Sequence, residues 1–320
     1  MALIGSDIAQ AKAHLDRGEL VGIPTETVYG LAGNALNEEA ALNIFKTKNR
    51  PEFDPLIVHT HAIEELDKYV TEIPEKAITL AHAVWPGPLT ILLEKKSIIP
   101  DLITSGLSTV AIRIPKHPLT LALLKSLDYP LAAPSANPFG YVSPTTASHV
   151  NDQLGEKIPY VLDGGPCSVG VESTIVGFEH DAKPTIYRLG GKKVEDIESL
   201  IGEVDVKLNK SSNPVAPGML LSHYAPGVQV HLGEISDLLK KHHDKRIGII
   251  SFSQSFSAPN IAKQIVLSQN ADLDEAARKI FSALRSLDSP EIDLIITEKL
   301  PETGLGRAIN DRLERAAVRY

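Results

Sequence analysis

The chain of 320 residues has a formal net charge of −8, with 43% apolar and 22% charged residues. These values fit a soluble globular protein of about two domains, and they disfavour extensive binding along duplex nucleic acid, which requires a basic face. The single cysteine, Cys167, excludes an internal disulfide and a cysteine-based zinc site, so we expect no protein-bound transition metal. Because no apolar run reaches about 18 residues, we expect a cytoplasmic protein.

Short apolar strands and amphipathic helices make up the expected first domain, residues 1–202. The pattern predicts strands at 20–24, 55–59, 89–94, 109–115, 131–134, 160–165, 173–178 and 185–190. It predicts helices at 7–18, 38–48, 74–84, 118–127 and 145–154. Because the later strands follow one another directly, the sheet should be mixed rather than wholly parallel.

The composition changes at residues 203–227, where the stretch KLNKSSNPVAPGMLLSHYAPG contains three prolines and two glycines. Such a stretch, with little periodicity, predicts a linker. After it, apolar and amphipathic segments alternate in the order strand, strand, helix, strand, helix. The sequence therefore predicts a second, smaller α/β domain at residues 228–320.

The segment KTKNRPEFDPLIVH, residues 46–59, places three cations at the end of a predicted helix. Cations in a last helical turn complement the helix dipole, and Pro51 ends the helix, so helix capping is one explanation. It leaves the following acid, the strand and His59 unexplained. A site for a small anion is the alternative that the segment leaves open.

Polar residues recur where predicted strands end. Ser135, Asn137 and Ser143 occupy the loop APSANPFGYVSPT, where hydrogen bonds to phosphate or to the loop itself are both reasonable expectations. Arg113 lies in an apolar strand and requires a carboxylate partner, from the protein or from a ligand. Ligands of open α/β sheets bind at strand ends, which favours one shared cleft.

Familiar catalytic motifs are absent from the sequence. There is no phosphate-binding G-x-x-x-x-G-K-[ST] loop, no G-x-G-x-x-G turn and no G-x-S-x-G elbow. The glycines of TGLGRAIN, residues 303–310, are better explained by a turn from strand to helix. The residues alone thus indicate an α/β enzyme that binds a small anion or a nucleotide and uses no covalent nucleophile.

Several motifs in fixed order allow a more specific interpretation. They are GIPTETVYGLAGNA, Lys48 and Arg50 followed by PLIVH, the SAN of residues 135–137, DGG, GVESTIV, YRLG and PGMLLSHYAP. This set resembles the YrdC-type threonylcarbamoyl-AMP synthases over nearly the whole chain, in their long two-domain form. The resemblance implies a YrdC-like twisted mixed sheet with helices, then a linker and a smaller Rossmann-like α/β domain.

The activity implied by the resemblance joins L-threonine, bicarbonate (or carbon dioxide) and ATP into threonylcarbamoyl-AMP, with release of pyrophosphate. Magnesium would accompany ATP. A downstream threonylcarbamoyl transferase would then modify an adenosine beside the anticodon of certain tRNAs. Partners implied in this way are that transferase and, through weak contact, tRNA; no membrane is implied.

Site residues follow from the same resemblance, position by position. The expected catalytic residues are Lys48 and Arg50. Expected ATP contacts are Lys48, Arg50, Asp54, Thr109, Ser135, Asn137, Ser143, Arg188 and Tyr224. Expected threonine contacts are Thr27, His59, Arg113, Ala133 and Ser173.

Two positions depart from the family pattern. Asn49 replaces a usual glycine, and Asp54 replaces a usual asparagine, which would place a carboxylate beside a triphosphate.

Two other functions compete with the synthase. A non-catalytic RNA-binding module of the same fold is disfavoured by the acidic net charge. A carbamoyl-transfer domain of hydrogenase maturation is disfavoured because such proteins carry cysteine-rich zinc fingers.

Overall fold

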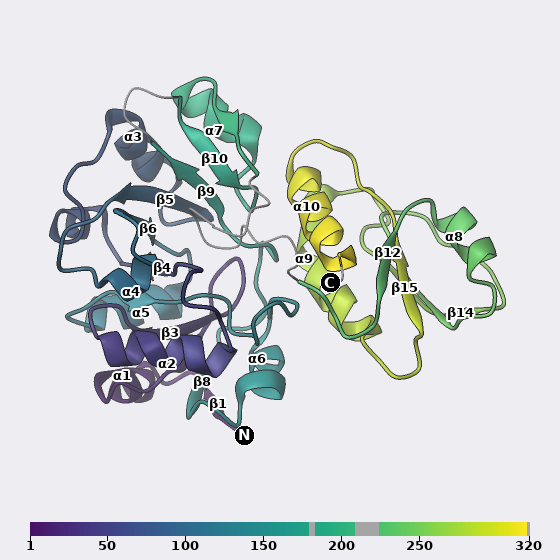
Figure 1. Ribbon diagram of the computed structural model, residues 1–320, viewed down its shortest axis with the longest axis horizontal. Helices are drawn as coiled ribbons and strands as arrows, with labels where there is room; N and C mark the ends of the chain where they lie inside the picture. Colours follow the sequence, from purple (N-terminus) through teal and green to yellow (C-terminus); the bar gives the residue numbers. More distant parts are fainter. Residues whose placement is uncertain (179–182, 209–223, 319–320) are drawn as a thin grey trace.

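The computed structural model describes residues 1–178, 183–208 and 224–318. Two units, each built on its own sheet, lie side by side (Figure 1). Most of the predicted linker, residues 209–223, falls outside the described residues. No helix in the described ranges is long and apolar enough to cross a membrane.

The first unit is built on an 11-stranded sheet with the order β1-β8-β2-β3-β7-β4-β6-β5-β9-β10-β11. Its strands are β1 (Leu3–Gly5), β2 (Val21–Ile23), β3 (Gly30–Asn34), β4 (Ile57–His59), β5 (Leu89–Glu94), β6 (Thr109–Arg113), β7 (Leu131–Ala132), β8 (Tyr160–Leu162), β9 (Thr174–Gly177), β10 (Thr185–Arg188) and β11 (Asp205–Val206). β4 pairs with β6 in parallel, whereas β5 and β6 are antiparallel. The prediction of a mixed sheet is therefore confirmed.

Helices cover the two faces of this sheet unequally. They are α1 (Ile8–Asp16), α2 (Glu38–Lys48), the 3-10 helix η1 (Ile63–Lys68), α3 (Glu75–Val84), α4 (Asp101–Thr104), α5 (Pro118–Ser126), α6 (Ala147–Leu154) and α7 (Val194–Ile201). On one face, α2, α3, α6 and α7 share a core with the strands. On the other face, α1 and α5 pack over β2, β7 and β8.

The remaining part of that second face has a small core made of strand residues only. These residues are Ile57, Leu92, Ala111, Ile175 and Tyr187, from β4, β5, β6, β9 and β10. Side chains alternate between the faces of a sheet, so residues two positions away on the same strands share this face. The face thus offers a platform on which polar side chains can lie next to a cavity.

The second unit, here called the C-terminal domain, is a four-stranded parallel sheet with the order β12-β15-β13-β14. Its strands are β12 (Val230–Leu232), β13 (Ile247–Ser251), β14 (Ile261–Val266) and β15 (Leu294–Thr297), and its helices are α8 (Ile235–Lys241), α9 (Leu273–Leu287) and α10 (Leu305–Ala317). The turn predicted at TGLGRAIN joins β15 to α10. β12 and α8 were not predicted, because each is too short to show a clear period.

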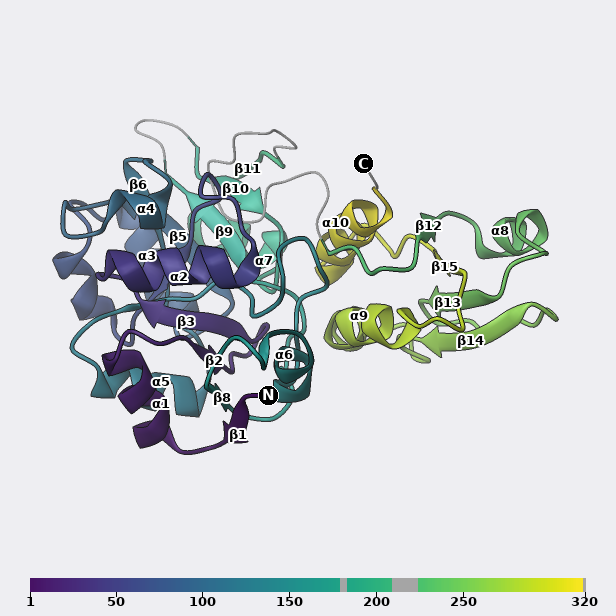
Figure 2. The ribbon, with the colours of Figure 1, turned by 60° about the horizontal axis from the view of Figure 1, so that its bottom comes forward.

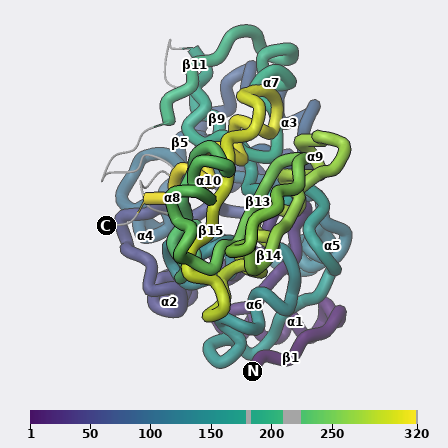
Figure 3. The backbone as a smooth tube through the Cα atoms, turned by 90° about the vertical axis from the view of Figure 1, so that its right-hand side faces the viewer, coloured from purple at the N-terminus to yellow at the C-terminus, as the bar shows by residue number. Residues whose placement is uncertain are grey.

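Helices α9 and α10 lie between the small sheet and the first unit, whereas α8 lies on the far side (Figure 2). In the view of Figure 3 the C-terminal domain lies in front of the middle of the first unit, which extends beyond it at α7 and at β1. Val28, Val142 and Val171 of the first unit belong to the same apolar core as residues of α9 and α10. The Tyr141 hydroxyl donates to Asp288 across this contact at 2.5 Å. Both apolar packing and hydrogen bonds therefore join the two units.

Candidate active site

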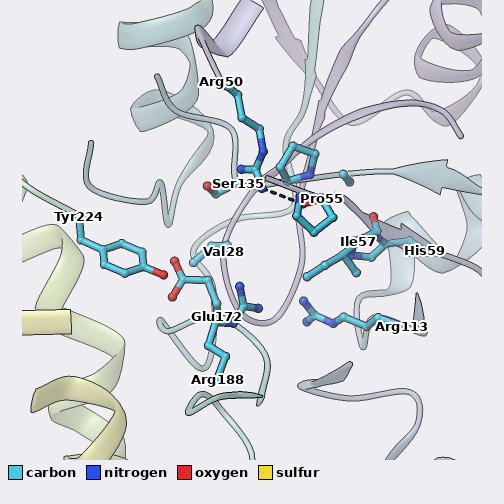
Figure 4. Close-up of a pocket in the computed structure, with 12 residues that line it drawn as sticks. Val28, Arg50, Pro55, Ile57, His59, Arg113, Ser135, Glu172, Arg188 and Tyr224 are labelled. Atoms are coloured by element: carbon cyan, nitrogen blue, oxygen red, sulfur yellow. Dashed lines mark hydrogen bonds between the residues drawn. The ribbon is translucent and has the colours of Figure 1, made fainter. Parts of the chain in front are cut away.

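A pocket of about 510 Å³, including the part open to solvent, lies on the platform face beside the C-terminal domain (Figure 4). The predicted site residues that line it are Arg50, His59, Arg113, Ala133, Ser135, Arg188 and Tyr224. Those that do not line it are Thr27, Lys48, Asp54, Thr109, Asn137, Ser143 and Ser173. The pocket therefore brings together residues from distant parts of the chain.

Strand register places one wall of the pocket. Ile57 pairs with Ala111, and His59 pairs with Arg113, between the parallel strands β4 and β6. Because alternate residues of a strand point to the same face, His59 and Arg113 extend the platform begun by Ile57 and Ala111. The end of each strand thus supplies one polar side chain to the pocket.

Arg113 has the carboxylate partner that its apolar strand requires, namely Glu26. Its Nη2 lies 2.8 Å from Glu26 Oε1, and both side chains are 4% exposed. The alignment is not that of a hydrogen bond, and neither Nε nor Nη2 of Arg113 has a hydrogen-bond partner among the described residues. A buried guanidinium with open donors is suited to a second carboxylate, from a ligand.

His59 is held as a neutral imidazole. Burial, then the adjacent charge of Arg113, lowers the pKa of His59 to about 3. Its Nδ1 lies 3.2 Å from the carbonyl oxygen of Ile57. At neutral pH the ring can therefore donate or accept hydrogen bonds in the pocket without adding charge.

Lys48 is buried beneath the loop that carries Ser135. Its Nζ donates to the carbonyl oxygens of Ser135 and Asn137, each at 2.5 Å. Burial, then the charge of Arg50, lowers the pKa of Lys48 well below its ordinary value. In this arrangement Lys48 shapes the loop, while the exposed Lys46 at the same helix end is free to act as the cation of a helix terminus.

Arg50 and Asp54 form a buried ion pair at the edge of the pocket. Arg50 Nη2 lies 2.9 Å from Asp54 Oδ2, and the guanidinium also donates to the carbonyl oxygens of Asp54 and Pro55. Only Arg50 lines the pocket. The carboxylate that departs from the family pattern is thus turned toward Arg50, away from the position of a pocket ligand.

The remaining residues expected to contact ATP differ in their positions. Asn137 Nδ2 donates to the carbonyl oxygens of Pro138 and Tyr141, within its own loop. Thr109 begins β6 opposite Glu94. Neither lines the pocket, so in this structure they support the surrounding loops and strands.

Thr27 and Ser173, expected near threonine, lie just behind the pocket wall. Thr27 Oγ1 is 2.9 Å from Thr25 Oγ1. Ser173 Oγ is 2.7 Å from Thr90 Oγ1 and accepts from Arg188 Nη2 at 3.1 Å. Arg188 also donates through Nε to the carbonyl oxygen of Ser173, so Ser173 fixes an arginine that does line the pocket.

Sequence reasoning missed two acids at this site, Glu26 and Glu172. Glu172 lines the pocket and accepts from the Ser143 hydroxyl at 2.6 Å. Each acid lies in one of the family motifs, next to a residue expected to contact threonine. Glu26 precedes Thr27 in PTETV, and Glu172 precedes Ser173 in VESTIV. The available signal was an acid next to an apolar strand, after β2 for Glu26 and before β9 for Glu172, which must be paired if it is buried.

Three buried arginines give the pocket a lining suited to anions. Arg50, Arg113 and Arg188 are all buried and all line it. Burial, then the charge of Glu26, raises the pKa of Cys167 to about 12, which leaves an unreactive thiol. Within the described ranges no group of three or more His, Cys, Asp or Glu residues could hold a metal ion.

Comparison with known proteins gives matches to both units. A family model described as "Telomere recombination" (Sua5, YciO, YrdC) matches residues 13–190, and one described as "Threonylcarbamoyl-AMP synthase, C-terminal domain" matches residues 193–318. The threonylcarbamoyl-AMP synthase of Pyrococcus abyssi is 41% identical, over 96% of this chain and 93% of that protein. The Bacillus subtilis protein of the same name is 40% identical, over 97% and 92%.

A solved structure matches the whole fold. The crystal structure of Pyrococcus abyssi Sua5 complexed with L-threonine has a TM-score of 0.92 and 38% identity, and the match covers 99% of this chain and 98% of that one. The likeness therefore extends through both units and their mutual arrangement.

Proposed function

The chain belongs to the threonylcarbamoyl-AMP synthase family, a family of nucleotidyltransferase-type enzymes, in its long two-domain form, and we propose that it forms threonylcarbamoyl-AMP and pyrophosphate from L-threonine, bicarbonate and ATP. The observation that carries this proposal is the convergence of three buried arginines, Arg50, Arg113 and Arg188, on one pocket. Two substrates with separate negative charges would be held there together, in the geometry that a direct reaction between them requires.

Threonine is assigned to the part of the pocket beside β4 and β6. The open donors of Arg113 suit its carboxylate, as an arginine fork binds a carboxylate through two parallel hydrogen bonds. Neutral His59 and the backbone at Ala133 border the same part. Thr27 and Ser173, which do not line the pocket, support this part through their hydrogen bonds to Thr25, Thr90 and Arg188.

ATP is assigned to the part that contains Arg50, Ser135, Arg188 and Tyr224. The two arginines would face the phosphates. The other proposed ATP contacts, Lys48, Asp54, Thr109, Asn137 and Ser143, surround this part and position the residues that line it. Lys48 has this role because it fixes the carbonyl oxygens of the Ser135 loop.

The proposed reaction needs no protein nucleophile. Bicarbonate loses hydroxide to give carbon dioxide. The threonine amine attacks its carbon and loses a proton, which leaves with the hydroxide as water and gives a carbamate. A carbamate oxygen then attacks the α-phosphorus of ATP, the bond to the β-phosphate oxygen breaks, and pyrophosphate leaves. Negative charge accumulates on the leaving group, so fixed cations such as Arg50 and Arg188 would lower the barrier.

Magnesium is proposed to enter as the complex with ATP. The described residues contain no cluster suited to a resident metal ion, and Glu172, the acid that lines the pocket, is already paired. When bound with ATP, the ion would neutralise part of the negative charge of the phosphates. The product would pass to a downstream threonylcarbamoyl transferase in the cytoplasm, with at most weak contact to tRNA, because the chain is acidic overall.

Isotope transfer from bicarbonate tests this function. With ATP, L-threonine and carbon-labelled bicarbonate, mass spectrometry should detect an adenylate that carries both threonine and the labelled carbon. The same mixture without threonine should give no labelled adenylate. Absence of the product, together with salt-sensitive binding of tRNA, would instead support the non-catalytic RNA-binding alternative.

A further inference from the structure

An arginine of the C-terminal domain reaches the wall of the pocket. Arg312 of α10 has a side chain that is 0% exposed, and its Nε donates to Glu172 Oε2 at 2.9 Å. Its Nη1 donates to Asp311 Oδ2 at 2.6 Å, and its Nη2 donates to the carbonyl oxygen of Leu189 at 2.8 Å. The guanidinium also lies 5.0 Å from the centroid of the Tyr224 ring. The planar guanidinium therefore donates to three acceptors, two in the first unit and one in the C-terminal domain.

Glu172 connects this arginine to the pocket. One carboxylate oxygen accepts from Arg312, and the other accepts from the Ser143 hydroxyl. Figure 4 shows the carboxylate of Glu172 and the hydroxyl of Tyr224 directed toward each other, with the Arg188 guanidinium below. Glu172 thus lies among three side chains, Ser143, Arg188 and Tyr224, that the proposed function assigns to ATP.

The charge balance at this point depends on α10. Burial alone would raise the pKa of Glu172, but the charges of Arg312 and Arg188 outweigh it and hold that pKa below its ordinary value. A carboxylate that must stay ionised beside a triphosphate repels it unless a cation neutralises it. Arg312 supplies this cation from behind the wall, and Arg188 adds a second positive charge on the pocket side.

We propose that Arg312 is a positioning residue through which the C-terminal domain shapes the ATP part of the active site. It neutralises and orients Glu172 and supports the Tyr224 ring, without contacting ATP itself. The threonine part, around Arg113 and His59, does not depend on it. This inference rests on the proposed function, and it gives the C-terminal domain a direct part in the reaction.

Steady-state kinetics of Arg312→Gln in the full chain test the inference. The KM for ATP should rise about ten-fold or more, because a charge-assisted hydrogen bond is lost and a buried carboxylate is left unneutralised. The KM for threonine should change less than about three-fold, within the spread of a single weak contact. A purely structural role would lower the melting temperature and leave both KM values of the folded enzyme unchanged.

Arg307→Gln is the matched control. Arg307 lies on the same helix and also crosses to the first unit, where its Nη2 is 3.2 Å from Glu195 Oε1, but it is partly exposed. Its replacement should leave both KM values within about two-fold of wild type, as expected for an exposed ion pair. An equal rise in the KM for ATP in both variants would show that any weakening of the interface has this effect, and would overturn the proposal.

Removal of the second charge tests whether the effect passes through Glu172. The double variant Glu172→Gln, Arg312→Gln should have a lower KM for ATP than Arg312→Gln alone, since the unneutralised carboxylate is gone. Additive losses would contradict this route. If Arg312→Gln does not fold, Arg312→Lys is measured instead: it keeps the charge but loses the three directed donors, so its KM for ATP should rise, though by less than ten-fold. An unchanged KM for ATP in that folded variant would reject the orienting role that the proposal assigns to Arg312.

The proposed function can fail independently of this inference. If wild-type enzyme makes no threonylcarbamoyl-AMP, the function is wrong. ATP affinity measured by calorimetry on wild type and Arg312→Gln still tests the positioning role in that case. Equal affinities would reject it.

Discussion

Arg113 and Glu26 form a buried ion pair at the base of the pocket, with 2.8 Å between Nη2 and Oε1. The other carboxylate oxygen of Glu26 accepts from the backbone N–H of Lys116 at 2.9 Å. Glu26 is thereby fixed, and it holds the guanidinium in place with two donors still open. Under the proposed function, Arg113 is thus already in position for the threonine carboxylate before the substrate binds.

Glu26→Gln should destabilise the fold by about 3 kcal/mol, because removal of one member of a buried pair leaves the other charge unneutralised. Saturating threonine should raise the melting temperature of this variant more than that of wild type, since the substrate carboxylate becomes the only partner of Arg113. Thermal unfolding with and without threonine measures both effects. Glu94→Gln, at an exposed position of β5, is the control; equal destabilisation by the two changes would contradict the account.

Lys48→Met should reduce the rate of pyrophosphate release by about a hundred-fold, the loss expected when two buried hydrogen bonds no longer fix the Ser135 loop. It should also lower the unfolding free energy by about 2 kcal/mol. Lys46→Met, two residues earlier on the exposed side of the same helix end, should change neither. Full activity of a folded Lys48→Met enzyme would contradict this role and would show that the cations of residues 46–50 serve only to cap the helix.

Arg50→Gln should weaken ATP binding, whereas Asp54→Asn should not. Loss of Arg50 removes a cation from the pocket, so the KM for ATP should rise by about ten-fold or more. Asp54→Asn removes the charge that now partly neutralises Arg50, so the KM for ATP should fall or stay unchanged. Weaker ATP binding by Asp54→Asn would show instead that the carboxylate takes part in binding.

Acid should destabilise the protein partly through His59. Its pKa in the folded state is about 3, against 6.5 ordinarily, so the unfolded chain takes up a proton that the folded chain rejects. The stabilisation is complete above pH 6.5 and is lost as pH falls toward 3. Between about pH 6 and pH 4, His59→Gln should make the decline in unfolding free energy shallower by about 1.4 kcal/mol per pH unit.

Denaturant titrations at several pH values measure this slope. His61→Gln serves as the control, because His61 lies two residues further along the chain and is only partly buried. Identical slopes in wild type and His59→Gln would contradict a buried neutral imidazole. His149, whose pKa is also lowered to about 4 by burial and by the charge of Arg285, should keep part of the acid sensitivity in both variants.

Local sequence patterns predicted most helices and strands of this protein, but some elements lack such a pattern. The predicted bounds of the helix at 38–48 are correct to the residue, because the spacing of its apolar residues and Pro51 define them. β3 was missed because its sequence GLAGN contains two glycines, which disfavour a strand. A Cβ at Gly33 would lie 2.9 Å from Leu20 Cδ2, so any larger residue there would have to displace that side chain.

The roles of individual site residues depended on contacts between distant segments. The motif was enough to predict Lys48 as a site residue. It could not predict that the Lys48 side chain donates a hydrogen bond to a loop 87 residues away. The pair of Glu172 and Arg312, 140 residues apart, gives no local signal at all. Sequence reasoning therefore gave the site's composition more completely than its geometry.

Pyrophosphate release by the wild-type enzyme tests the central claim most directly. With ATP and magnesium present, threonine and bicarbonate are each omitted in turn. If one pocket joins both substrates to ATP, release should require threonine and bicarbonate together and fall to background when either is absent. Equal release without threonine would contradict the account, because the pocket around Arg113 would then take no part in the reaction.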